Sequence, residues 1–151
     1  MKHRNGDLFT TDAKIIAHGA NITGVMGAGV AKTLRQKYPE NYKGYRAFCK
    51  ARLAVAGEWY ANTGDDANRL ILNLFTQDLP GPNAKYLWVF SSLDDFIEIA
   101  DEHLDKYGKT IAIPEIGSGI GGLEWKKVQS VLETLETLHP DWEFEVWHYE
   151  G

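Results

Sequence analysis

The chain has 151 residues, with 44% hydrophobic and 25% charged side chains, and its net charge is −5. This length and composition predict one globular domain spanning residues 1–151 and exclude a disordered chain. No apolar run approaches the ~20 residues of a membrane span, and the N-terminal MKHRNGD has no apolar core of a signal peptide.

The charge balance and the single cysteine restrict the compartment and the binding partners that we expect for the protein. Cys49 cannot form an internal disulfide, and the chain has one adjacent basic pair, Lys126-Lys127. An acidic chain without basic clusters argues against a broad surface for nucleic-acid backbones. The five histidines show no metal-ligand spacing. We therefore expect a cytoplasmic monomer with no metal, no cofactor, and no nucleic-acid or membrane partner.

The first half of the chain contains a strand, a glycine loop and a helix in succession. A short apolar run at residues 15–17 is typical of a buried strand, and residues 21–30 contain Gly24, Gly27 and Gly29. Apolar spacing then predicts helices over residues 28–38 and 40–53, separated at Pro39. Residues 58–61 and 69–76 are expected to be strands on either side of a turn.

The second half repeats this pattern. Apolar spacing predicts a helix over residues 89–107, followed by a β-branched run from Thr110. The next loop contains four glycines, at positions 117, 119, 121 and 122, and an amphipathic helix through Val128 and Leu132 follows it. Residues 144–149 are expected to be the last strand. Alternating strands and helices predict an α/β fold with a largely parallel sheet covered by helices on both faces.

The two glycine loops, residues 21–30 and 117–122, hold seven of the 15 glycines. Because both follow a strand and precede a helix, their backbone N–H groups and helix N-termini are suited to binding anions at one edge of the sheet. Gly117, Gly119 and Gly122 match GxGxxG, but only 29 residues follow Gly122, which is too few for a dinucleotide-binding domain. A P-loop would need Lys at Val30, and a GxSxG nucleophile elbow would need glycines two positions to either side of Ser118, where the chain has Ile116 and Ile120.

Five segments in order carry a resemblance to a known family. Gly6-Asp7-Leu8, IIAHGAN, GVMGAGVAKTLRQKYP, LNLFTQ and PEIGSGIGGLEW resemble the successive signatures of a macrodomain. The resemblance covers nearly the whole chain and lies nearest to the branch of the ADP-ribose 1″-phosphate phosphatases and terminal ADP-ribose glycohydrolases. It implies a three-layer α/β/α domain with a mixed sheet that binds ADP-ribose or its phosphorylated or protein-linked derivatives.

The resemblance also implies which residues contact the ligand. Asp7 and Leu8 would hold the adenine, although an aspartate at such a position can equally cap a turn. The first loop would surround the distal ribose and one side of the pyrophosphate, and the second loop would close the other side. The full set of implied ligand contacts is Asp7, Leu8, Gly27, Ala28, Gly29, Val30, Thr76, Gln77, Pro114, Gly117, Ser118, Gly119, Ile120 and Gly121.

Catalytic residues of the family are only partly present. Relatives with a catalytic lysine place it where this chain has Gln77, and their partner aspartate where it has Gly121. The remaining candidates are His18, which matches a histidine of the phosphatases, Asn21 and Asp78. A histidine with a pKa near neutrality suits proton donation to a leaving sugar oxygen. Asp78 can alternatively begin a turn, and Asn21 can order its loop.

Two kinds of function remain open from the sequence. The first is a hydrolase, with ADP-ribose 1″-phosphate as the expected substrate and with removal of ADP-ribose without the Lys/Asp pair as a variant. The second is a non-catalytic reader of free or protein-linked ADP-ribose, which the absent lysine and aspartate would favour.

Overall fold

The computed structural model describes residues 1–119 and 121–149, and its centre is one mixed β-sheet. Within these residues the sheet has six strands in the order β1-β6-β5-β2-β4-β3. All neighbours are parallel except β3, which pairs antiparallel with β4 at one edge. The strands are β1 (Lys2–Asn5), β2 (Ile15–Asn21), β3 (Trp59–Asn62), β4 (Leu70–Gln77), β5 (Thr110–Pro114) and β6 (Glu143–His148).

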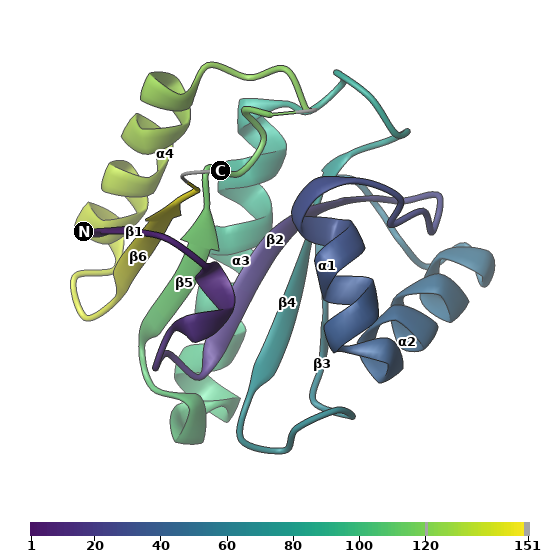
Figure 1. Ribbon diagram of the computed structural model, residues 1–151. Coiled ribbons are helices and arrows are strands. Elements are labelled where there is room, and N and C mark those ends of the chain that lie inside the picture. Colours follow the sequence, from purple (N-terminus) through teal and green to yellow (C-terminus); the bar gives the residue numbers. More distant parts are fainter. Residues whose placement is uncertain (120, 150–151) are drawn as a thin grey trace.

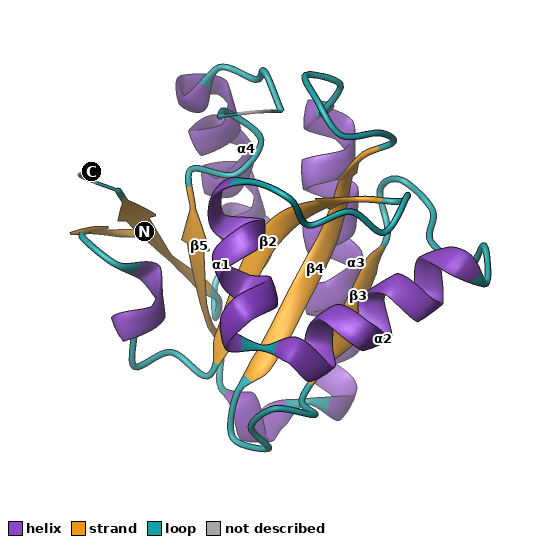
Figure 2. Ribbon diagram, turned by 45° about the vertical axis from the view of Figure 1, so that its right-hand side comes forward, coloured by secondary structure: helices purple, strands orange, loops and turns teal. Residues whose placement is uncertain are grey.

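Helices cover both faces of this sheet (Figures 1 and 2). One face carries α1 (Gly29–Lys37), α2 (Pro39–Lys50) and the short 3-10 helix η1 (Leu8–Thr10). The other face carries α3 (Tyr86–His103), the 3-10 helix η2 (Asp105–Tyr107) and α4 (Trp125–Leu138). The expected three-layer α/β/α architecture with a mixed, largely parallel sheet is therefore confirmed.

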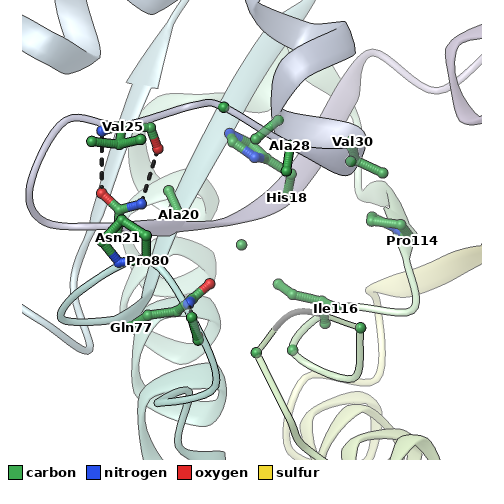
Figure 3. A pocket seen from close by; sticks show the side chains of 18 of the residues that line it. His18, Ala20, Asn21, Val25, Ala28, Val30, Gln77, Pro80, Pro114 and Ile116 are labelled. Atoms are coloured by element: carbon green, nitrogen blue, oxygen red, sulfur yellow. Dashed lines mark hydrogen bonds between the residues drawn. The ribbon is translucent and has the colours of Figure 1, made fainter.

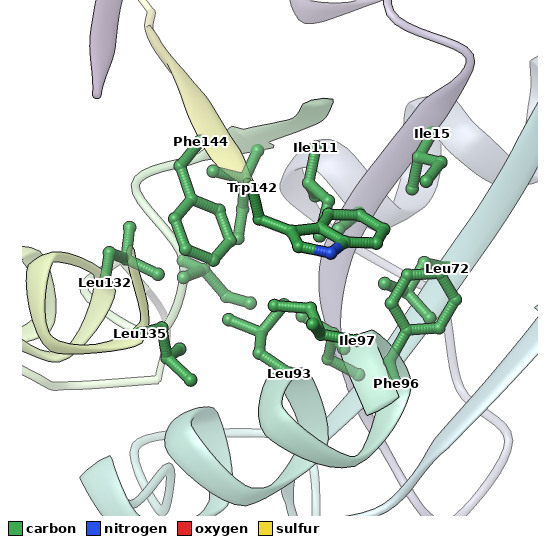
Figure 4. Close-up of a cluster of buried hydrophobic side chains, with 14 of the residues drawn as sticks. Ile15, Leu72, Leu93, Phe96, Ile97, Ile111, Leu132, Leu135, Trp142 and Phe144 are labelled. Carbon is green, nitrogen blue, oxygen red and sulfur yellow. The ribbon is translucent and has the colours of Figure 1, made fainter. Parts of the chain in front are cut away.

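Side-chain alternation along β2 explains how one strand supports both layers. Ile15 and Ala17 point into the larger core beneath α3 and α4, which Figure 4 shows, whereas Ile16 packs toward α1. A strand buried on both faces needs apolar residues at successive positions, as the run at residues 15–17 provides. His18 belongs to the α1 and α2 side and is the polar exception in this run.

Strand β1 and several element boundaries differ from the sequence-based prediction. All four β1 side chains are exposed, so the strand has no hydrophobic pattern, and its parallel pairing with β6 supplies the structure instead. The helix expected at residues 89–107 begins at Tyr86 and is α-helical only to His103. The helix expected to reach residue 53 ends at Lys50. No helix of the described residues is long and apolar enough to cross a membrane.

Candidate functional site

A cavity of about 370 Å³ opens at the carboxyl ends of β2, β4 and β5, where both glycine loops meet (Figure 3). A second cavity, of about 510 Å³, adjoins it and shares Gly29, Val30 and Pro114 with it. The two form one cleft along the sheet edge, as the positions of the loops predict. We call them the loop cavity and the N-terminal cavity.

Asn21 organises the first glycine loop. Its Oδ1 accepts hydrogen bonds from Thr23 N (3.1 Å), Thr23 Oγ1 (2.8 Å) and Val25 N (3.3 Å), and its Nδ2 donates to Val25 O (2.9 Å). The Tyr45 hydroxyl of α2 reaches Asn21 O and Oδ1 at 2.7 and 2.9 Å. Asn21 lines the loop cavity, but these bonds give its side chain the loop-ordering role that the sequence left open.

The first turn of α1 borders the loop cavity. Gly29, Val30 and Ala31 line the cavity, together with Gly27 and Ala28 from the loop. Ala28 is the N-cap residue and supplies no side-chain hydrogen bond, and Gly29 has a φ of +59°. The first N–H groups of a helix have no partner within the helix and lie at the positive end of its dipole. This turn is therefore built to receive an anion.

The second loop is a tight turn held by its own backbone. Leu123 N donates to Gly117 O (2.8 Å), and Gly117 has a φ of +75°. Ser118 directs its hydroxyl to Glu115 O (2.7 Å) and is absent from the cavity lining, whereas Gly117, Gly119 and Gly121 belong to it. Ile120, also expected to contact ligand, lies outside the described residues.

Gly121 cannot hold a side chain in this loop. A Cβ built there would lie 2.6 Å from Gly117 O and 2.9 Å from Ala84 Cβ, distances that real Cβ atoms do not show. Packing therefore explains why this chain has no aspartate at position 121. A single substitution to aspartate would require the loop to shift.

Three site residues were expected at or just after the end of β4, namely Thr76, Gln77 and Asp78, and one of them lines the loop cavity. Gln77 lines the loop cavity, and its Nε2 donates to Gly81 O (2.6 Å), which fastens the following loop. Thr76 is buried beneath Gly19 and lines neither cavity. Asp78 is exposed and also lies outside both linings, and its backbone N–H donates to Asn83 Oδ1 (2.9 Å). The catalytic role of Asp78 stays a prediction.

His18 lies at the base of the loop cavity with a defined tautomer. Asn73 Nδ2 donates to Tyr60 O (2.9 Å), so its Oδ1 must be the atom that meets His18 Nε2 at 2.6 Å. An oxygen there can only accept, and Nε2 therefore carries the proton. Asn41 Nδ2 donates to the same Oδ1 at 3.2 Å. His18 Nδ1 is then a bare acceptor, with no hydrogen-bond partner among the described residues.

Burial also sets the charge of this histidine. Loss of solvation lowers the pKa of His18 from 6.5 to about 4, against the smaller opposing effect of its hydrogen bond to Asn73. The ring is neutral near pH 7. The role expected from the sequence was proton donation, but a neutral ring whose one proton is held by Asn73 can offer an acceptor instead.

The N-terminal cavity holds the residues expected to bind adenine. Asp7, Leu8 and Phe9 line it, together with Trp147 and Tyr149 from the end of β6. Asp7 Oδ1 accepts from Phe9 N (2.9 Å) and caps η1, so the capping role considered from the sequence is present alongside its place in the cavity.

Several lining residues were not foreseen. Pro80 and Gly81 follow β4, Val25 lies in the middle of the first glycine loop, and Glu115 directly follows β5. Each lies in a segment that follows a strand at the carboxyl edge of the sheet, so the positions of the strand ends could have indicated them. In the part of the chain that the structure describes, no three His, Cys, Asp or Glu residues come together as a metal site.

Comparisons with known proteins agree with this architecture. The ADP-ribose 1″-phosphate phosphatase of Candida albicans is 29% identical over 149 residues, which cover 92% of this chain and 96% of that protein. The DNA ADP-ribosyl glycohydrolase of Mycobacterium tuberculosis is 29% identical over 143 residues, and the match spans 40% of that protein's length. The solved macrodomain of Mycobacterium tuberculosis DarG superposes with a TM-score of 0.87 at 26% identity, covering 97% of this chain and 95% of that one.

A match to a family model identifies the family. The model described as "Macro domain" matches residues 17–132, from the middle of β2 into α4, which is more than half of the chain. The matched region contains both glycine loops and His18. The chain therefore belongs to the Macro domain family.

Proposed function

We propose that the protein binds ADP-ribose derivatives and hydrolyses the phosphate monoester of ADP-ribose 1″-phosphate. The observation that carries this proposal is the loop cavity, where the uncapped first turn of α1 and His18 line the same space, and His18 Nδ1 has no hydrogen-bond partner among the described residues. The adenosine half of the ligand would occupy the N-terminal cavity beside Asp7. The similarity to the Candida phosphatase covers nearly the full length of both chains.

The chemistry requires charge stabilisation and a group that orients water. Water attacks phosphorus, the bond from phosphorus to the sugar oxygen breaks, and a proton lost by the attacking water ends on the departing sugar oxygen, which leaves as a hydroxyl. Backbone N–H groups of α1 would stabilise the phosphoryl oxygens, an interaction that strengthens as charge moves onto them. His18 Nδ1 would accept a hydrogen bond from the attacking water, which suits a neutral imidazole.

Phosphate release from ADP-ribose 1″-phosphate tests the proposal. His18→Ala should lower kcat by about 100-fold, within the range for loss of one acid–base group, with little change in ADP-ribose affinity. Asp78→Asn tests the other predicted role, and we expect full turnover because Asp78 lies outside the cavity lining. Full turnover by His18→Ala would contradict the proposed role, and loss in Asp78→Asn would transfer that role to Asp78.

A second candidate is removal of ADP-ribose from a macromolecule. Relatives named DNA ADP-ribosyl glycohydrolase, including one from Thermus aquaticus at 31% identity over 99% of this chain, favour it, although the chain spans only 41% of that relative. Gln77 and Gly121 weigh against the Lys/Asp route. The same assay run with ADP-ribosylated DNA and ADP-ribosylated protein separates these activities. ADP-ribose binding without turnover of any substrate would leave the non-catalytic reader.

A further inference from the structure

A strongly basic surface covers α1, α2 and the turn that follows them. Residues 29–53 contain seven Lys or Arg and one acidic residue, whereas the rest of the chain contains nine and twenty. The net charge of −5 is therefore the sum of a basic segment, residues 29–53, and an acidic remainder of the chain. All seven basic side chains are exposed, and we call them the basic face: Lys32, Arg35, Lys37, Lys43, Arg46, Lys50 and Arg52.

Helix geometry aligns part of the basic face along α2. Lys43, Arg46 and Lys50 are spaced by three and four residues, so they share the side opposite the buried Tyr45 and Cys49. A rise of 1.5 Å per residue places Lys43 and Lys50 about 10 Å apart along the axis. That length matches about three successive phosphates of one nucleic-acid strand.

The basic face adjoins the mouth of the loop cavity. Arg46 packs against the first glycine loop, because a Cβ built on Gly24 would lie 3.7 Å from Arg46 Cγ. The next residue, Val25, lines the cavity and is 48% exposed. Figure 3 shows Val25 on the side of the cavity away from Pro114, which is shared with the N-terminal cavity. A chain leaving the loop cavity at Val25 would meet Arg46 first.

Acidic residues neutralise only one end of this surface. Lys43 pairs with Glu40 at 3.3 Å, and Asp65 accepts from the backbone N–H groups of Glu40 and Asn41 at 2.9 Å. Both acids therefore lie at the N-terminal end of α2. Toward its C-terminal end, Arg46 and Lys50 form no ion pair with any described residue.

We propose that the basic face binds the phosphodiester backbone of a nucleic-acid strand and guides it past the mouth of the loop cavity. The complementary charge and the placement at the cavity mouth carry this proposal. It reverses the expectation of no nucleic-acid partner, which rested on net charge and on adjacent basic residues. It does not depend on the phosphatase activity, since backbone binding needs no reaction in the cavity.

Fluorescence anisotropy with unmodified single-stranded DNA and RNA of about 20 nucleotides tests the proposal. Three phosphate contacts predict that affinity falls about 20-fold between about 50 and 200 mM salt. The double variant Lys43→Glu/Lys50→Glu should weaken binding by about 10-fold or more at the lower salt. Comparing DNA with RNA shows whether the strand type matters to backbone binding.

Lys126→Glu/Lys127→Glu on α4 is the matched control. It makes the same charge change, and it also breaks one ion pair at i,i+3 spacing, since Lys127 pairs with Glu124 as Lys43 pairs with Glu40. We expect this control to change nucleic-acid affinity by less than about twofold. Calorimetry with ADP-ribose should give wild-type affinity for both double variants, which would show that the cavity is intact.

Three results would overturn the proposal. The first is that neither the DNA nor the RNA strand binds at low salt. The second is that the α2 and α4 variants lose nucleic-acid affinity equally. The third is stronger binding to vesicles rich in anionic lipid than to either strand, which would make the basic face a membrane-surface site. Milder Lys43→Gln/Lys50→Gln substitutions give about half the effect on log affinity and cover the case of a misfolded charge reversal.

Discussion

The two walls of the loop cavity are built on different principles. The first wall, formed by β2, the first glycine loop and the first turn of α1, is ordered by polar side chains, with Asn21 and Tyr45 at the loop and His18 with Asn73 beneath it. The second wall, formed by β5 and the second glycine loop, is ordered by backbone bonds and by glycines without room for a side chain. Acid–base chemistry can therefore come from the first wall, whereas the second supplies shape.

Gly121→Asp tests the claim about the second wall and should have the largest effect. The new Cβ would meet Gly117 O at 2.6 Å, so the loop must open to accept it. We expect ADP-ribose affinity to fall by about 100-fold, with a clear drop in Tm and no gain of glycohydrolase activity, because overpacked sites distort their backbone. Calorimetry and thermal unfolding measure both changes.

Gly119→Ala is the control for that experiment. A Cβ at Gly119 meets no described atom within 4 Å, and its backbone is not in the left-handed region. Its Tm should stay within a degree or two of the wild type, on the order of a neutral surface change. Wild-type affinity in Gly121→Asp would show that the second wall adapts and that its missing carboxylate is not explained by packing.

The pH dependence of stability tests the first wall through His18. Its pKa falls from 6.5 in the unfolded chain to about 4 in the fold, so unfolding takes up a proton between these values. Stability is unaffected above about pH 6.5, decreases as the pH falls toward about 4, and loses about 3 kcal/mol from this group in total.

His18→Gln should remove this part of the pH dependence. The neutral amide can still donate to Asn73, and denaturant unfolding at several pH values gives the difference from the wild type. His103→Gln is the control because His103 is 67% exposed, and its pH profile should match the wild type. An unchanged profile in His18→Gln would mean that the pKa of His18 is the same in the folded and unfolded chain, and burial would then not be what keeps the ring neutral.

The two walls also differ in how far the sequence could predict them. The glycine spacing indicated both loops and placed them at one sheet edge, since glycine patterns and strand ends are local features. The network around His18 was not predictable, because its partner Asn73 lies 55 residues away and meets it only through the pairing of β2 with β4, and Asn41, which bonds Asn73, comes from α2. The basic face was missed for a similar reason: helical spacing separates its residues in the chain.

Whether a residue lines a cavity also depends on the direction in which its side chain points, and a sequence motif does not specify that direction. Ser118 and Thr76 belong to motifs that follow the family pattern, yet one hydroxyl turns to Glu115 O and the other is buried under Gly19. The sequence placed both residues near the site and could not tell which way their side chains point.

Asn21→Ala and Tyr45→Phe separate the two supports of the first loop and should have the smallest effects. Asn21→Ala removes the acceptor shared by Thr23 and Val25, so we expect ADP-ribose affinity to fall by about 10-fold and stability by about 1–2 kcal/mol. Tyr45→Phe removes one hydroxyl, whose single proton can serve only one of its two acceptors at a time. The loss in affinity should then be about threefold.

The double variant shows whether the losses of affinity in the two single variants are independent. If Asn21 holds the loop and Tyr45 only anchors Asn21 to α2, the double variant should be no weaker than Asn21→Ala alone, because the Tyr45 bond has already lost its side-chain partner. Additive losses would mean that the bond from Tyr45 to the Asn21 carbonyl supports the strand end independently. The first wall would then rest on its backbone as the second does, and the contrast between them would reduce to His18.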